Sequence, residues 1–87
     1  MTDYLPLPGT PIEELDTPCI IVELDVAERN IAKLQSAANE MGVDVRPHSK
    51  TNKSPYWVRK QIEAGAIGVC CAKVGEAEVM VEAGVSD

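Results

Sequence analysis

The sequence predicts an α/β fold of parallel strands joined by helices, and the evidence is a repeated boundary between helix and strand. Three glycines each precede an apolar segment, at Gly42-Val43, Gly65-Ala66 and Gly84-Val85. Two of these boundaries follow the same pair of residues, Glu63-Ala64 and Glu82-Ala83, and the glycines are 23 and 19 residues apart. Such intervals fit one strand and one helix, which is typical of parallel strands with right-handed crossovers. A closed (β/α)8 barrel needs roughly 250 residues, so we expect this chain to be the N-terminal, truncated part of a TIM-type barrel.

The composition is that of a small acidic protein with an ordinary apolar content. The 87 residues carry a net charge of -6, and 45% of them are hydrophobic, which suffices for a small core. The acidic balance argues against nucleic acid or an anionic membrane as the main partner. No apolar run approaches the roughly 20 residues of a membrane span, and the N-terminus lacks the basic region of a secretory signal. We therefore expect a cytoplasmic protein.

Three cysteines agree with that location. Cys70 and Cys71 are adjacent, so on a strand they would point to opposite faces, and Cys19 makes the number odd. We expect all three to be reduced and buried as small hydrophobic residues. A zinc site would need spaced pairs of ligands, which the sequence does not contain.

Residues 1–17 are predicted to form an extended arm, and residues 18–87 the first β/α units of the barrel. The arm is rich in proline, threonine and acidic residues, which disfavour a packed element. After Thr17-Pro18, the β-branched residues of the segment 19–24 predict a strand.

A helix is predicted from Asp25 to about Met41. Asp25 with Glu28 three residues later resembles a capping box, and Gly42 should end the helix in a left-handed conformation. One apolar stripe recurs at helical spacing: Ala27, Ile31, Leu34, Ala38 and Met41.

The remaining elements repeat the alternation of strand and helix. We expect strands at residues 43–45, 66–72 and from 85, and helices at about residues 55–64 and 75–83. Ser54 and Pro55 form a typical helix start, as cap and first helical residue. The segment 66–72 is almost continuously apolar, as expected of a strand buried on both faces.

The chemistry should lie in the polar residues that follow the strand at 43–45. Pro47 lacks a backbone donor, so a central strand should end there, and strand ends that lead into polar loops are where β/α folds place active sites. A lysine amine at such a strand end, partly walled by apolar side chains, loses its proton easily and can form a Schiff base with a carbonyl cofactor. The alternative, which composition alone favours, is that Lys50 and Lys53 are solvated loop lysines.

An ordered series of motifs carries a family resemblance. The motifs are Thr17-Pro18, Asp25 with Glu28-Arg29-Asn30-Ile31, Arg46-Pro47-His48-Ser49-Lys50-Thr51-Asn52-Lys53, Gln61 with Gly65-Ala66, and Ala72-Lys73-Val74-Gly75-Glu76-Ala77-Glu78. Over residues 16–87 the chain resembles the N-terminus of the D-threonine aldolase and D-serine dehydratase-like enzymes. These enzymes share the alanine-racemase-like fold of pyridoxal-phosphate proteins, known as fold type III. The run of residues 46–53 is the most specific part of the match.

The resemblance implies that Lys50 is the catalytic residue. In this family the first lysine of the run carries pyridoxal 5'-phosphate as an internal aldimine, at the end of the first barrel strand. His48, Arg46 and Thr51 are the other candidate cofactor-binding residues. For each an ordinary role stays open: His48 could fix the loop, Arg46 could pair with an acid, and Thr51 could order the turn. The family usually has histidine where this chain has Asn52, so the resemblance does not carry an acid or base role to that position.

Two more residues near the expected barrel mouth have open interpretations. Lys73 ends the second predicted barrel strand, where electrostatic assistance and a plain ion pair are both open. Glu76 is interpreted as a favourable charge at a helix start rather than a catalytic group.

The resemblance also implies a two-domain, homodimeric lyase that acts on small D-amino acids. A mostly β domain would follow the barrel and include the strand at 19–24. The phosphate-binding residues and the ligands of a divalent metal, zinc or manganese, would lie beyond residue 87. Such enzymes cleave D-3-hydroxy amino acids to glycine and an aldehyde, or dehydrate them to a keto acid and ammonia. We expect the 87 residues alone to be inactive.

The sequence leaves two alternative functions open. One is an amino-acid racemase of the same fold, and the other is a non-catalytic pyridoxal-phosphate homeostasis protein whose single barrel also holds the cofactor on a strand-end lysine. The Arg46-Pro47-His48 sequence favours the lyase.

Overall fold

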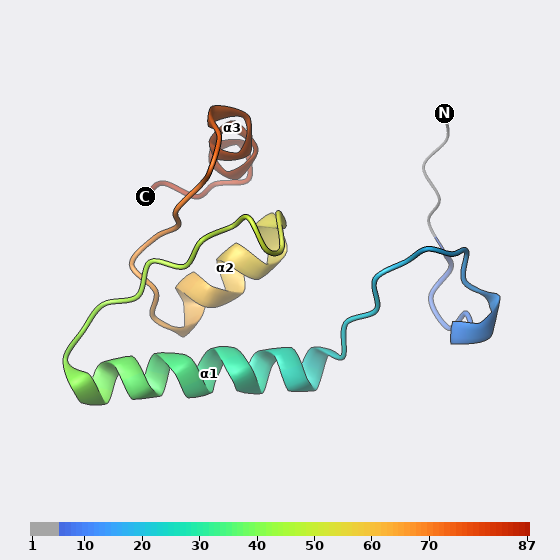
Figure 1. Ribbon diagram of the computed structural model, residues 1–87, viewed down its shortest axis with the longest axis horizontal. Coiled ribbons are helices and arrows are strands. Elements are labelled where there is room, and N and C mark those ends of the chain that lie inside the picture. Colours follow the sequence, from blue (N-terminus) through green and yellow to red (C-terminus); the bar gives the residue numbers. More distant parts are fainter. Residues whose placement is uncertain (1–5) are drawn as a thin grey trace.

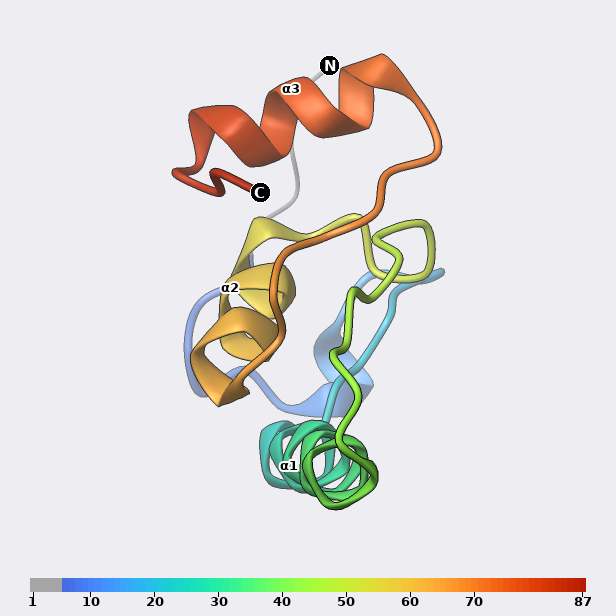
Figure 2. The same ribbon diagram turned by 90° about the vertical axis from the view of Figure 1, so that its left-hand side faces the viewer.

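The computed structural model describes residues 6–87, which form three α-helices and one short 3₁₀ helix (Figure 1). The elements are η1 (Ile12–Glu14), α1 (Leu24–Met41), α2 (Pro55–Ala64) and α3 (Val74–Glu82). Figure 2 shows α1, α2 and α3 stacked one above the other, with extended segments of chain passing between them. The first five residues of the predicted arm lie outside the described part, and η1 is a turn within the arm that the sequence did not predict.

The start of α1 corrects two predictions. The strand expected at residues 19–24 is absent, because residues 19–23 are irregular and Leu24 already belongs to α1. A strand needs a partner for its backbone hydrogen bonds, and no described segment pairs with this one, so Ile20 is 93% exposed. The N-cap is Glu23 rather than Asp25, which lies in the first turn.

The ends of α1 and α2 confirm the predicted glycine stops. Gly42 adopts φ 71° and its N–H donates to the carbonyls of Ala38 and Asn39. Gly65 adopts φ 127° and likewise closes α2. Pro55 is the first residue of α2, as predicted, and Ser54 is its N-cap residue, although the Ser54 side chain makes no capping hydrogen bond.

Within residues 6–87 no strand is present, which corrects the prediction of strands at 43–45, 66–72 and from residue 85. Extended segments occupy these places, and we call residues 43–49 the first, residues 66–72 the second and residues 85–87 the third extended segment. They are joined by a few β-type contacts, which include a parallel bridge between His48 and Cys70 and a hydrogen bond of 3.0 Å from the N–H of Val69 to the carbonyl of Asp87.

Pro47 explains why the first two segments share only one bridge. The bridge consists of the N–H of Cys70 donating to the carbonyl of Pro47 at 2.9 Å and the N–H of Ser49 donating to the carbonyl of Cys70 at 2.8 Å. A regular parallel ladder would continue with an N–H at position 47, which proline lacks. The register instead shifts by one residue, and the N–H of Ile67 donates to the carbonyl of Val45 at 2.9 Å.

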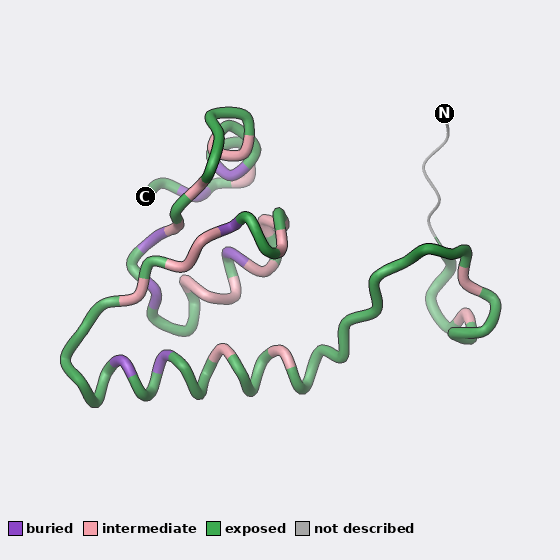
Figure 3. The backbone as a smooth tube through the Cα atoms, viewed as in Figure 1, coloured by how far each residue is buried: buried purple, intermediate pink, exposed green. Residues whose placement is uncertain are grey.

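The main core lies between α2, α3 and the extended segments. Its buried members are Val58 from α2, Met80 from α3 and Val85 from the third extended segment, and Ile62, Val69 and Cys71 pack against them. Figure 3 shows how sparse the buried positions are along the chain. The second extended segment was predicted to be buried on both faces, and this is wrong: Ile67 and Cys70, which alternation places on opposite faces, are both exposed.

The inward face of α1 differs from the predicted stripe. The stripe is confirmed at Ala38, which is buried, and at Ala27 and Ile31, which are half-buried, but Leu34 and Met41 are exposed and Gln35 is buried in their place. The reason is the close approach of the turn after α2, where a Cβ on Gly65 would lie 3.1 Å from the Cδ of Gln35. The polar Gln35 is therefore buried, whereas the predicted apolar stripe placed the neighbouring Leu34 on the inward face.

The cysteines are free thiols, but two of them are not buried. Cys19 and Cys70 are exposed and Cys71 is half-buried, so the expectation of three buried residues is wrong for the first two. Cys19 lies in the irregular segment before α1, and Cys70 lies in the second extended segment. In residues 6–87 no helix is long and apolar enough to cross a bilayer.

The exposed apolar surface leads to a prediction for the 87-residue polypeptide on its own. Among residues 6–87 five hydrophobic residues are buried, whereas large side chains such as Ile20, Val74 and Met41 are mostly exposed. Unpaired extended edges and uncovered apolar faces promote association. We expect the isolated polypeptide to self-associate or to lack a cooperative transition, as measured by size-exclusion chromatography with light scattering and by a thermal melt. A monodisperse 9.4 kDa species with one sharp transition would contradict this expectation.

Gly68 gives a second prediction. A Cβ at this buried position would lie 2.7 Å from the backbone carbonyl group of Asp87 and 2.7 Å from a guanidinium nitrogen of Arg46. In the full-length protein, Gly68→Ala should lower the free energy of unfolding in urea by roughly 1–3 kcal/mol, because backbone must move to make room. Gly75→Ala is the matched control: nothing lies within 4 Å of its added methyl group, and alanine is favoured over glycine in a helix by about 0.5–1 kcal/mol. Equal effects of the two substitutions would refute the steric explanation.

Candidate functional site

The polar run of residues 46–53 lies at the end of the first extended segment and turns into the loop that leads to α2 (Figure 2). Two hydrogen bonds close the turn: the N–H of Lys53 donates to the carbonyl of Ser49 at 2.7 Å, and the N–H of Ser54 donates to Oδ1 of Asn52 at 2.9 Å. Lys53 adopts a left-handed conformation with φ 49°. Asn52 therefore orders the turn, which is a role that its short side chain suits.

Lys50 is exposed at the tip of this turn. Within residues 6–87 its side-chain amine makes no ion pair and no hydrogen bond, so the amine is accessible. Its backbone N–H donates to Nδ1 of the half-buried His48 at 3.0 Å. Because Nδ1 accepts this bond, the ring proton of neutral His48 is assigned to Nε2. This contact is the loop-fixing role that the sequence left open for His48.

Arg46 is held away from the loop tip by the third extended segment. Its Nη2 lies 3.0 Å from Oδ1 of Asp87, and its Nη1 donates to the carbonyl of Val69 at 3.3 Å. The pairing of Arg46 with an acidic residue is thus present. Thr51 and Lys73 are both exposed, with Lys73 at the N-cap of α3.

Ser49 and Glu76 form the most buried polar contact beside Lys50, and sequence reasoning missed Ser49 entirely. Ser49 has no exposed surface, and its Oγ donates to Oε2 of Glu76 at 3.2 Å. The same Oγ lies 3.5 Å from Sγ of Cys71. The one sequence signal was alternation: Ser49 sits between His48 and Lys50, so on an extended segment it faces the opposite side from both.

Positive charge is concentrated around this loop although the protein is acidic. Between Asp44 and Glu63 the sequence has no acidic residue and contains five basic ones: Arg46, Lys50, Lys53, Arg59 and Lys60. Arg46 pairs with Asp87, and Lys60 lies 3.7 Å from Glu28. Among the described residues, the two lysines of the loop have no acidic partner.

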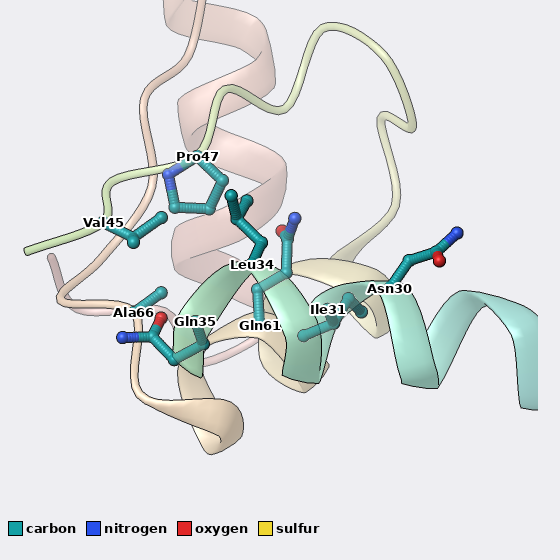
Figure 4. A pocket seen from close by; sticks show the side chains of 8 residues that line it. All are labelled: Asn30, Ile31, Leu34, Gln35, Val45, Pro47, Gln61 and Ala66. Atoms are coloured by element: carbon teal, nitrogen blue, oxygen red, sulfur yellow. The ribbon is translucent and has the colours of Figure 1, made fainter. Parts of the chain in front are cut away.

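A cavity of about 230 Å³ lies on the other side of Pro47, between α1, α2 and the first two extended segments (Figure 4). The lining residues are Asn30, Ile31, Leu34, Gln35, Val45, Pro47, Gln61 and Ala66. Its walls are mainly apolar, and the buried Oε1 of Gln61 has no hydrogen-bond partner in the described part of the chain. Lys50 and His48 do not line it, so the cavity does not include the candidate Schiff-base lysine.

The residues described contain no group of three His, Cys, Asp or Glu side chains that could hold a metal ion. At this turn the structure presents the accessible amine of Lys50. The imidazole of His48 lies beside the Lys50 backbone, and the Glu76 carboxylate accepts a hydrogen bond from the adjacent buried Ser49. An exposed amine of this kind can bind a carbonyl compound covalently.

Comparisons with known proteins bear on the same residues. The chain matches no protein-family model. It is 40% identical over 80 residues to D-threonine aldolase from Arthrobacter sp., covering 92% of this chain and 21% of that protein. It is 44% identical over 87 residues to 3-hydroxy-D-aspartate aldolase from Paracoccus denitrificans, covering 98% of this chain and 22% of the relative.

Solved structures agree with the sequence comparisons. The crystal structure of D-threonine aldolase from Filomicrobium marinum is similar with a TM-score of 0.83 and 45% identity, over 87% of this chain and 21% of that one. D-threo-3-hydroxyaspartate dehydratase from Delftia sp. HT23 is similar with a TM-score of 0.81 and 42% identity, over 85% of this chain and 20% of that one. The chain spans about a fifth of the length of these relatives. By sequence and by structure, therefore, the chain is similar to about one fifth of D-threonine aldolases and of related hydroxyaspartate aldolases and dehydratases.

Proposed function

We propose that the chain is the N-terminal part of a longer pyridoxal-phosphate-dependent lyase that acts on D-3-hydroxy amino acids. The observation that carries the proposal is the identity of 40–45% to enzymes named for D-threonine, 3-hydroxy-D-aspartate and D-threo-3-hydroxyaspartate. A D-serine dehydratase from Dictyostelium discoideum is 44% identical over 43 residues. The amino acids in these names share the D configuration and a hydroxyl group on carbon 3, and a bond to carbon 3 is broken in both aldol cleavage and dehydration.

The proposed architecture is a (β/α)8 barrel that begins with the three extended segments. The parallel direction of the His48–Cys70 bridge and the contact from Val69 to Asp87 support it, because both join neighbouring segments in chain order. In this proposal residues 1–17 are an arm and residues 18–87 are the first β/α units. A mostly β domain follows later in the chain.

The residues present fit the cofactor that the family resemblance implies. Lys50 would hold pyridoxal phosphate through a bond between its amine nitrogen and the cofactor's aldehyde carbon, and its amine is exposed and unpaired within residues 6–87. His48 keeps its Nε2 proton free to donate, because its Nδ1 is occupied by the N–H of Lys50. Arg46 and Thr51 remain proposed cofactor contacts. Arg46 is paired with Asp87 in the structure, so it would contact the cofactor with a guanidinium nitrogen that this ion pair does not use, or after the ion pair breaks.

When bound, the cofactor supplies an electron sink for the substrate carbon from which a bond is broken. The chain's own part is to present the Lys50 amine on an ordered turn and to keep cations around it. A divalent metal, zinc or manganese, would polarise the 3-hydroxyl group, and we propose ligands for it later in the protein. One solved structure of a D-threo-3-hydroxyaspartate dehydratase mutant is described as the metal-free form. That description implies that this enzyme also has a metal-bound form.

Cytoplasmic location and a homodimer complete the proposal. Three free thiols support a reducing compartment, and the dimer rests on family resemblance alone. None of the relatives named above is a racemase or a non-catalytic binding protein, so the lyase is the function we carry forward.

Covalent labelling tests the role of Lys50. The full-length protein is incubated with pyridoxal phosphate, reduced with borohydride and mapped by peptide mass spectrometry. We expect the label on Lys50, and we expect Lys50→Ala to lose it while Lys53→Ala and Lys73→Ala keep it. Label on Lys53 or Lys73 with none on Lys50 would reject the assignment.

Product analysis tests the reaction class. With pyridoxal phosphate and a divalent metal, the full-length protein should convert D-threonine to glycine and acetaldehyde, or D-serine to pyruvate and ammonia, and should leave the L-enantiomers intact. Chromatography on a chiral column distinguishes the alternatives. Interconversion of enantiomers without cleavage would indicate a racemase, and tight cofactor binding without turnover would indicate a binding protein.

A further inference from the structure

A hydrogen bond next to Lys50 links the fully buried Ser49 to Glu76. We propose that these two are positioning residues: the hydrogen bond from the buried Ser49 hydroxyl to the Glu76 carboxylate fixes the backbone that carries Lys50. The proposal rests on the function proposed above, because it concerns how Lys50 is presented to its cofactor. It assigns Glu76 a role beyond a favourable charge at a helix start.

Ser49 uses each of its polar groups in the structure. Its N–H donates to Cys70 at 2.8 Å, its carbonyl accepts from Lys53 at 2.7 Å, and its Oγ donates to Glu76 at 3.2 Å. With no exposed surface, the side chain cannot replace a lost partner with bulk water. The residue that directly precedes Lys50 is therefore fixed to three other parts of the chain.

Glu76 occupies the place where the parallel pairing of the first two segments stops. Beyond the His48–Cys70 bridge, the next ladder bond would run from the N–H of Ala72 to the carbonyl of Ser49. That carbonyl is already bonded to Lys53, and the N–H of Ala72 lies 3.4 Å from Oε2 of Glu76 instead. One carboxylate oxygen thus accepts from the ends of both segments and ties them to the first turn of α3.

A charged acceptor makes this contact difficult to replace. Hydrogen bonds to ionised groups are stronger than neutral ones, and a buried hydroxyl left without its partner carries the full desolvation penalty. The alternative acceptor, Sγ of Cys71 at 3.5 Å, is a weak one. Among residues 6–87, the side-chain hydrogen bonds that would remain at the turn are those from the N–H of Lys50 to His48 and from the N–H of Ser54 to Asn52, and neither of them holds Ser49.

The consequence concerns reactivity as well as stability. An amine reacts with a bound aldehyde only when the two atoms are held in a suitable geometry, and small displacements reduce the rate strongly. Ser49 and Glu76 do not touch the cofactor in this proposal. They restrict where the Lys50 backbone can lie, so their loss should slow the reaction of Lys50 and reduce its preference over other lysines.

The test compares variants of the full-length protein. Reaction with pyridoxal phosphate is followed by absorbance, and borohydride trapping with peptide mapping gives the share of label on Lys50. In Ser49→Ala and in Glu76→Ala the rate of Lys50 labelling should fall about tenfold, the size expected for losing a hydrogen bond to a charged group. Glu76→Gln keeps an acceptor oxygen and should recover most of the rate. Because the two residues act through one bond, the double variant should be no slower than Glu76→Ala.

Glu78→Ala is the matched control, since Glu78 is an exposed carboxylate on the same helix with no hydrogen bond among residues 6–87. Thermal melting of each cofactor-free variant separates unfolding from misplacement, and if Glu76→Ala does not fold, Ser49→Ala decides alone. Folded Ser49→Ala that labels Lys50 at the wild-type rate and selectivity would overturn the proposal, as would an equal loss in Glu78→Ala. Failure of the wild-type protein to label at Lys50 would instead refute the proposed function.

Discussion

The missing N–H of Pro47 constrains the arrangement of the whole described chain. Because proline cannot donate at that position, the pairing of the first two extended segments loses its regular register before their single bridge, His48 with Cys70. After the bridge, the carbonyl of Ser49 accepts from Lys53 rather than from Ala72, so the chain turns there and exposes Lys50. A fully paired strand would have carried its hydrogen bonds past this point and delayed the turn.

The two sides of this bridge are packed differently. On one side Val58, Met80 and Val85 form a small apolar core that orients α2 and α3 against the extended segments. On the other side α1 meets the turn after α2 through Gln35 and Gly65, and leaves a cavity beside Pro47. The turn that carries Lys50 follows the first extended segment and lies outside both packed regions. Its conformation therefore depends more on hydrogen bonds than on apolar contacts.

Local signals in the sequence predicted the helices well and the strands poorly. Gly42, Gly65 and Pro55 act through the conformation of a single residue, so the helix boundaries they mark can be read without knowing the partners. A strand exists only when another segment supplies donors and acceptors, and the β-branched residues before α1 have no such neighbour in the described structure. The link between Ser49 and Glu76 spans 27 positions, which no local pattern encodes. Lys50 was identified through its motif, since an exposed lysine has no distinctive packing.

The uneven distribution of charge has a consequence for how a ligand would reach the loop. Five of the eight basic residues lie between Asp44 and Glu63, while the chain as a whole is negative. A cationic region on an acidic molecule attracts anions locally and repels them elsewhere, so an anion would approach preferentially from this end. At physiological salt the attraction acts over about 8 Å, which is enough to guide a phosphate group over the last steps of its approach. High ionic strength would remove this guidance and leave the hydrogen bonds of the turn unchanged.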